Sequence, residues 1–177
     1  MKIKTLTTCA LFTALMCICG PLSVPIGPVP VSLTNLVLYF AVMILDTKKT
    51  FISYVVYLLI GIVGLPVFSG FQGGIAKVAG PTGGYLVGFL LMVIIGGIIM
   101  EKTKANIVFT IIGMIVGTAV CYVFGTIWFM MIMDYELAPA LTLCVWPFAP
   151  FDLIKIAVAV PVGKIIRKRL DAAGVLK

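Results

Sequence analysis

Histidine is absent from this 177-residue sequence, and charged residues are scarce, with 13 Lys and Arg against 6 Asp and Glu. Without imidazole the chain lacks the usual general base, the Ser-His-Asp triad and the commonest zinc and haem ligand. A soluble domain carries about a quarter charged residues, whereas here they make up 11%. These absences argue against most hydrolases and metalloenzymes, and against a water-soluble fold.

Two further motifs are missing. The sequence contains no Gly-x-x-x-x-Gly-Lys-Ser/Thr segment, so it has no P-loop with which to hydrolyse ATP. The five cysteines form no Cys-x-x-Cys pair and follow no metal-knuckle spacing, and most lie in apolar runs, where cysteine is a small buried hydrophobe. We therefore expect neither a resident cofactor nor a metal site.

Apolar residues dominate the chain. They make up 62% of it, and the mean hydropathy is +1.24, which places the chain in a lipid bilayer. We predict an all-α, polytopic membrane protein forming one domain over residues 1–177. Six transmembrane helices are expected, at about 5–20, 31–46, 50–66, 83–100, 106–133 and 149–166.

The net charge of +7 does not predict binding to nucleic acid, because the basic residues cluster between the apolar runs. Six alternating spans put all of them on one side except Lys77, in an outer loop, and Lys155, inside a span. The positive-inside rule makes that side the cytoplasm, so both termini of this cell-membrane protein are expected there. Residues 1–20 also resemble a signal peptide, but no Ala-x-Ala-like cleavage site follows, and we expect a retained helix.

The predicted outer connections are rich in proline and glycine. Four prolines occur in residues 21–30, glycines recur through 65–85, and Trp-Pro lies within 134–148. Irregular backbone at membrane depth is tolerated where it is buried in protein or lines a cavity. A pocket is therefore expected in the outer half of the bundle.

Several residues of the second connection are candidates for binding an anion. The pairs Gly73-Gly74 and Gly83-Gly84 either make turns or let backbone amides approach a carboxylate, and the second pair opens a predicted helix whose N-terminus favours negative charge. Lys77 is the only cationic side chain in the outer loops. It is either the partner of an anion or a solvated surface lysine.

Asp152 and Lys155 provide the clearest chemical signal. Three residues apart at the start of the last span, they share one helix face, and either charge alone in the bilayer would cost on the order of 3 kcal/mol. The pair either fixes helix packing, lies exposed at the membrane interface, or binds a solute. A cyclic urea fits the third interpretation, with its N–H groups donating to Asp152 and its carbonyl accepting from Lys155.

Other intramembrane residues support a pocket less strongly. Tyr85, Tyr122 and Trp128 either wall a flat ring or serve as packing and interface residues. The amide of Asn35 needs a polar partner within the bilayer, which is either another helix or a ligand. Ala10 and Ala14 place two small side chains on one helix face and permit close approach of another helix, internal or external.

Four segments together resemble the BioY family, the biotin-binding S components of energy-coupling factor transporters. The resemblance implies a six-helix vitamin-capture subunit, not an enzyme, that works with a transmembrane T component and two cytoplasmic ATPase subunits. The segments are Val24-Pro-Ile-Gly-Pro-Val-Pro-Val-Ser-Leu33, Gly61-Ile-Val-Gly-Leu-Pro-Val-Phe-Ser-Gly70, Gly80-Pro-Thr-Gly-Gly-Tyr-Leu-Val-Gly-Phe89 and Pro147-Phe-Ala-Pro-Phe-Asp-Leu-Ile-Lys155.

The resemblance also implies roles for individual residues. Ala10 and Ala14 match the small-residue motif with which S components meet the T component, and Asp152 and Lys155 match the motif expected to hold the ureido ring. The Gly83-Gly84-Tyr85 segment matches the loop-helix junction near the ligand.

One departure from the family pattern concerns the valerate carboxylate. Some relatives carry an arginine where this chain reads Phe71-Gln72-Gly73. Lys77 or backbone amides are the available substitutes.

The function expected from these observations is biotin capture at the outer face and delivery inward within an ATP-driven complex. Two alternatives remain open at this point. One is an S component for another vitamin or a desthio precursor. The other is a small lipid-acting membrane enzyme, for which Asp152 and Lys155 would be the only plausible acid-base pair.

Overall fold

The computed structural model describes residues 3–25 and 29–175. Within them the chain forms eight helices and one small antiparallel sheet. Their bounds are α1 (Ile3–Cys19), β1 (Ser23–Pro25), β2 (Pro30–Ser32), α2 (Thr34–Ile44), α3 (Thr47–Ile62), α4 (Ile75–Ala79), α5 (Gly83–Lys102), α6 (Ile107–Met133), α7 (Leu137–Cys144) and α8 (Ala149–Ala172).

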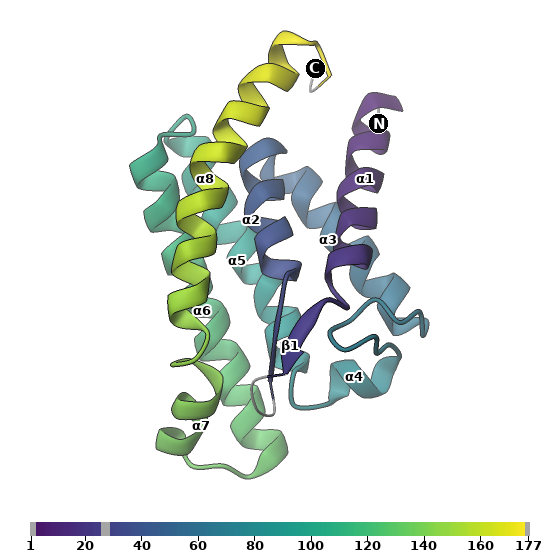
Figure 1. The fold of residues 1–177 in the computed structure, drawn as a ribbon, viewed down its shortest axis with the longest axis vertical. Helices are drawn as coiled ribbons and strands as arrows, with labels where there is room; N and C mark the ends of the chain where they lie inside the picture. The colour runs from purple at the N-terminus through teal and green to yellow at the C-terminus, as the bar shows by residue number, and fades with distance from the viewer. Residues whose placement is uncertain (1–2, 26–28, 176–177) are drawn as a thin grey trace.

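The helices form an elongated bundle with two different ends (Figure 1). Both chain ends lie at one end of the bundle, here called the terminal end, while β1, α4 and α7 lie at the other, here called the hairpin end. The antiparallel pair α5 and α6 packs along its length, α1 packs on α3, and α2 contacts α8, α5, α1 and α3. Almost every residue of α2 is buried, so α2 forms the centre of the bundle.

The prediction of six spanning helices is not confirmed. By length and composition α5 and α6 are each sufficient to cross a bilayer, and α7 with α8 make a third span if the 43° bend between them is counted within one crossing. With 11 residues, α2 is about 17 Å long, shorter than the ~30 Å hydrocarbon layer. The apolar segments were predicted correctly, but several are too short to span alone.

The all-α prediction also needs a correction. Residues 23–25 and 30–32 pair as a two-stranded antiparallel sheet, with Ser23 opposite Ser32. Proline favours extended backbone and lacks the N–H that a helix requires, which explains why the proline-rich connection forms a hairpin and why α2 begins only at Thr34.

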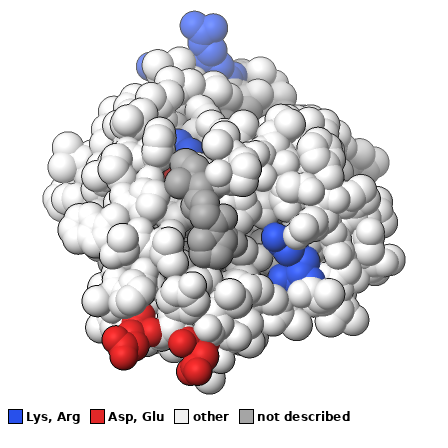
Figure 2. All heavy atoms as spheres, turned by 60° about the horizontal axis from the view of Figure 1, so that its bottom comes forward, with Lys and Arg blue, Asp and Glu red and all other residues white. Residues whose placement is uncertain are grey.

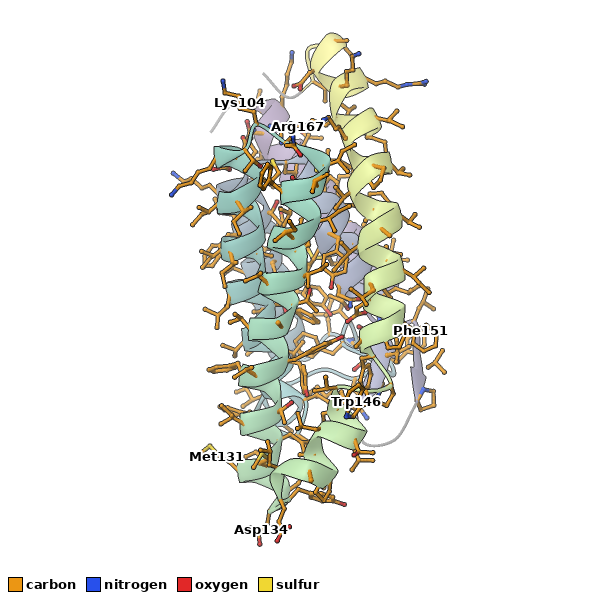
Figure 3. All side chains as sticks on the ribbon, turned by 90° about the vertical axis from the view of Figure 1, so that its left-hand side faces the viewer. Lys104, Met131, Asp134, Trp146, Phe151 and Arg167 are labelled. Atoms are coloured by element: carbon orange, nitrogen blue, oxygen red, sulfur yellow. The ribbon has the colours of Figure 1, made fainter. Side chains whose placement is uncertain are left out.

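The outer surface of the bundle is largely apolar, and its hairpin end carries only small groups of basic and acidic residues on a mostly uncharged surface (Figure 2). On α6 the exposed side chains include Val108, Phe109, Val123 and Ile127, a surface that suits lipid tails and would be unusual on a soluble monomer. Lys104 and Arg167 lie toward the terminal end and Asp134 lies at the hairpin end (Figure 3). The fold is therefore that of a multi-pass membrane protein.

At the terminal end Arg167 connects α8 to the end of α2. Its Nη1 donates to the carbonyls of Met43 and Leu45, each at 3.3 Å. Its Nη2 pairs with Asp46 at 3.4 Å, and Asp46 also pairs with Lys49 at 2.8 Å. Arg167, Asp46 and Lys49 are here called the Arg167 cluster; it supplies partners to carbonyls that a helix end leaves free.

Candidate functional site

A pocket lies inside the hairpin end of the bundle. Its cavity volume is about 70 Å³, inside a hollow of about 690 Å³ that counts the open space at its mouth. The hairpin, α2, α5, α6 and α8 all contribute to its walls. Its polar side chains include Ser32, Asn35, Ser69, Thr82, Tyr122, Asp152 and Lys155.

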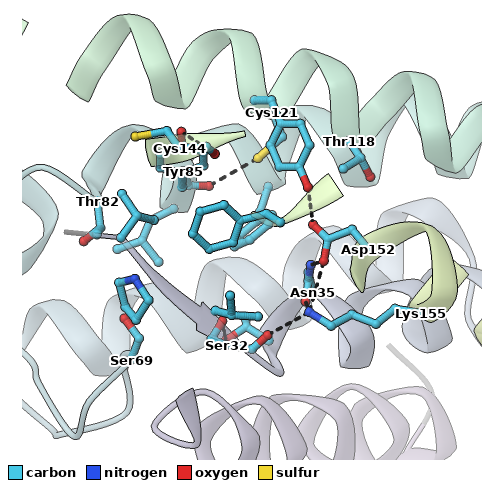
Figure 4. A pocket seen from close by; sticks show the side chains of 18 of the residues that line it. Ser32, Asn35, Ser69, Thr82, Tyr85, Thr118, Cys121, Cys144, Asp152 and Lys155 are labelled. Carbon is cyan, nitrogen blue, oxygen red and sulfur yellow. Dashed lines mark hydrogen bonds and ion pairs between the residues drawn. The ribbon is translucent and has the colours of Figure 1, made fainter. Parts of the chain in front are cut away.

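Asp152 is the centre of a polar network in this pocket (Figure 4). Its Oδ1 accepts from Asn35 Nδ2 at 2.6 Å and pairs with Lys155 Nζ at 3.0 Å, and its Oδ2 accepts from the Tyr122 hydroxyl at 2.6 Å. These four residues, here called the Asp152 cluster, join α2, α6 and α8. Because Asp152 lies in the first turn of α8, the helix dipole also favours its negative charge.

Lys155 uses all three of its N–H groups on protein atoms. Besides Asp152 they reach Asn35 Oδ1 at 2.9 Å and the backbone carbonyl of Ser32 at 3.1 Å. Both members of the ion pair are buried or nearly so, so the pair does not lie exposed at the membrane interface. A ligand carbonyl that accepts from Lys155 must therefore replace one of these three bonds.

The network nevertheless keeps capacity for a ligand. A carboxylate offers about four acceptor positions, and Asp152 uses three of them on the described residues. Asn35 carries a second N–H on Nδ2, beyond the one given to Asp152. A group that presents an N–H beside a C=O, as an amide or a cyclic urea does, matches that arrangement of acceptor and donor.

Aromatic and aliphatic side chains form the middle of the pocket, including Tyr85, Leu86, Phe89 and Phe148. The Tyr85 hydroxyl lies 3.2 Å from Thr126 Oγ1 and donates to the Cys144 carbonyl at 3.4 Å. These bonds fix the ring of Tyr85 in the wall. The middle of the pocket therefore suits the apolar part of a ligand.

Of the residues predicted to bind a ligand, Asn35, Tyr85, Tyr122, Asp152 and Lys155 come together in this pocket. They come from four helices and lie up to 120 positions apart in the sequence. Their common location was not derivable from spacing, apart from Asp152 and Lys155 on one turn of α8.

The predicted glycines and Trp128 lie beside the pocket rather than among its lining residues. A Cβ at Gly83 would collide with the Val78 carbonyl, and one at Gly84 would collide with the Trp128 side chain. Trp128 Nε1 donates to the Gly80 carbonyl at 3.0 Å. In this structure these three residues pack α5 closely against α4 and α6.

Gly73, Gly74 and Lys77 lie around α4. Gly74 has a φ of 88°, which a glycine adopts without strain, and its N–H bonds the Gly61 carbonyl at 2.7 Å. Gly73 and Lys77 line a second, shallower hollow with Gln72, Ala76, Gly80, Pro81 and Thr82. Partial burial lowers the pKa of the Lys77 ammonium.

Sequence reasoning missed Ser32, Ser69 and Thr82, which also line the pocket. Hydroxyl side chains are common in loops, so composition does not distinguish them. The one usable signal was that Thr82 follows Gly80-Pro81 and precedes a helix, the position of an N-cap.

Ala10 and Ala14 are exposed on α1. With Ile52 and Val56 of α3 they line an apolar groove on the outside of the bundle. The two alanines therefore lie on an accessible face, and their contact with a partner stays a prediction.

The comparison with known proteins assigns the family. The sequence model of the BioY family matches residues 1–172. The chain belongs to the BioY family. A relative from Pyrococcus horikoshii, named a probable biotin transporter BioY, is 36% identical over 97% of this chain and 98% of its own length. The biotin transporter BioY of Thermotoga maritima is 32% identical over 93% of this chain and 96% of its own length.

A solved structure gives the same result for the fold. The crystal structure of the S component for biotin from an ECF-type ABC transporter superimposes with a TM-score of 0.88 at 33% identity, covering 94% of this chain and 92% of that one. The resemblance seen in the four sequence segments is thus confirmed at the level of the whole chain.

Proposed function

We propose that this chain captures biotin with high affinity at the outer membrane face and delivers it inward as the S component of an ATP-driven ECF transporter. The observation that carries the proposal is the Asp152 cluster, a buried polar network at one end of an apolar-walled pocket. The relatives named as biotin transporters support the choice of biotin over other vitamins and over an enzyme activity.

The ureido ring of biotin matches the free capacity of the Asp152 cluster. One ring N–H donates to the remaining acceptor position of Asp152, and the ring carbonyl accepts from the second N–H of Asn35 or from Lys155. The sulfur-containing ring then lies against Tyr85 and Phe89 in the apolar middle of the pocket.

The orientation of the chain follows from charge. The basic residues near the chain ends make the terminal end cytoplasmic, which places the pocket toward the outside. The whole chain acts as one membrane domain, in which α1, α2 and α3 contribute crossings despite their length. Irregular backbone beside α2 is tolerated because Pro30, Val31 and Ser32 line the pocket. The proposed partners of the chain within the membrane and at its outer face are lipid and biotin. Nucleic acid is not a proposed partner.

Energy comes from partner subunits, a transmembrane T component and two cytoplasmic ATPases that hydrolyse ATP. The groove beside Ala10 and Ala14 is the proposed docking face for the T component, because small side chains let another helix approach closely.

Replacing both alanines by leucine should leave biotin binding unchanged and abolish uptake in cells that express the partner subunits. Ala157→Leu, at an exposed alanine of α8, is the matched control and should retain uptake.

Titration calorimetry on the purified protein tests the capture step. Biotin should bind, riboflavin and thiamine should not, and desthiobiotin should bind through the same ureido group. Absence of biotin binding, or equal binding of an unrelated vitamin, would refute the proposed substrate.

A further inference from the structure

The pocket has a second polar end, away from the Asp152 cluster. Ser69, in the connection between α3 and α4, and Thr82, just before α5, both line the pocket. Figure 4 shows them on one side of the pocket and Asp152 with Lys155 on the other, with Tyr85 between. A ligand long enough to lie past the apolar middle therefore meets hydroxyl groups at its far end.

The Thr82 hydroxyl is the unusual group at this end. Thr82 is 8% exposed, and its Oγ1 is buried with no hydrogen-bond partner among the described residues. It occupies the N-cap position of the 20-residue helix α5 but makes no capping bond. Buried hydroxyls are normally paired, because an unpaired one forfeits its hydrogen bond to water. The Thr82 hydroxyl is thus unpaired among the described residues, in a residue that lines the pocket.

The cationic side chain near this end, Lys77, lies outside the pocket that Ser69 and Thr82 line. Among the described residues that line the pocket, the charged side chains are Asp152 and Lys155, at the opposite end. Lys77 lines the neighbouring hollow, and Thr82 is the residue that the two hollows share. The Lys77 side chain therefore belongs to a hollow that adjoins the Thr82 end of the pocket, while the charged residues of the pocket itself lie at its other end.

We propose that Thr82 binds the terminal acyl oxygen of the ligand, whether that group is a carboxylate or an uncharged amide, and that Lys77 adds attraction only for the carboxylate. This inference rests on the proposed function and extends its substrate class to biotin derivatives with neutral ends. A hydroxyl can donate to a carboxylate or to an amide oxygen, with the stronger bond to the carboxylate, whereas a half-buried ammonium favours the anion through charge alone.

Calorimetry with two ligands, biotin and biotinamide, tests the proposal on detergent-purified full-length chain. Wild type should bind both. Thr82→Val, which exchanges the hydroxyl for a methyl group, should weaken both by about tenfold. Lys77→Gln should weaken biotin several-fold, remove part of the salt dependence of its affinity, and leave biotinamide unchanged.

Two matched variants serve as controls. Thr82→Ser keeps the hydroxyl and should bind both ligands as wild type does. Thr50 is another buried threonine whose hydroxyl has no partner among the described residues, but it does not line the pocket. Thr50→Val should therefore leave both affinities unchanged.

Three results would overturn the proposal without touching the proposed function. They are wild-type binding of biotin but not of biotinamide, unchanged affinities in Thr82→Val, and an equal effect of Lys77→Gln on both ligands. The first and third do not depend on the folding of any Thr82 variant. Failure of wild type to bind either ligand would instead refute biotin capture itself.

Discussion

The helices α2 and α8 are connected by polar groups at both ends of the molecule, and the two connections differ in burial. In the Arg167 cluster the side chains of Arg167, Asp46 and Lys49 are 25%, 45% and 21% exposed. In the Asp152 cluster, Asp152 and Lys155 are 8% and 12% exposed. Ion pairs near water contribute little, whereas removing one partner of a buried pair leaves an uncompensated charge. Similar chemistry therefore has a structural role at the terminal end and suits ligand binding at the hairpin end.

Asp152→Asn should produce the largest difference between the two ends. It removes the counter-ion of Lys155 and replaces one of the two acceptor oxygens with a donor NH₂ group, so biotin affinity should fall by at least about 100-fold. Asp46→Asn makes the same change in the Arg167 cluster and should leave affinity unchanged. Calorimetry on both variants checks this, and equal losses would mean that the two clusters are not functionally distinct.

Lys155→Gln should have the next largest effect. Asp152 keeps the donors Asn35 and Tyr122, so its charge remains partly compensated, and the affinity for biotin should fall by about 10- to 30-fold. Since Lys155 also donates to the Ser32 carbonyl, backbone hydrogen exchange should rise in β2. Unaltered exchange there would show that this bond does not hold the hairpin.

Tyr122→Phe tests a single bond within the Asp152 cluster. Loss of the hydroxyl removes one donor to Asp152 Oδ2 and should weaken biotin about three- to tenfold. The matched control is Tyr39→Phe, because the Tyr39 hydroxyl pairs with Thr118 at 2.8 Å and not with Asp152. A wild-type affinity in Tyr122→Phe would exclude a contribution of the Tyr122 hydroxyl to binding.

Arg167→Gln should have the smallest effect, and on stability alone. The cluster is partly exposed, so its contribution is expected to be no more than about 1 kcal/mol, which lowers Tm by about 2–4 °C for a chain of this size. Biotin affinity should be unchanged. A loss of affinity with unchanged Tm would assign the terminal end a direct part in binding.

Some features of the fold were predictable because they depend on local sequence. The predicted spans 83–100 and 149–166 begin where α5 and α8 begin, since Thr82 is of an N-cap residue type and Pro150 lies in the first turn of α8, both of which favour a helix start. Pairing of Asp152 with Lys155 follows from their spacing on one helix.

Other features depend on packing between distant segments and were not predictable. Tyr122 bonds to Asp152 from 30 positions away in the sequence, and Asn35 bonds to Asp152 from 117 positions away. No periodicity in the sequence encodes such contacts. Composition identified 31–46 as an apolar span, but the hairpin occupies its first residues and shortens α2 to 11 residues. The short helices α4 and α7 lie within connections that proline and glycine made appear irregular.

The bond from Lys155 to the hairpin ends on a main-chain oxygen, that of Ser32. Because every amino acid carries this oxygen, evolution can vary position 32 without losing the contact. In an alanine scan of the cavity, the substitution at Lys155 would remove this bond, but the substitution at Ser32 would leave it intact. The part that position 32 plays in anchoring the hairpin is therefore detected only by methods that alter or monitor the backbone itself.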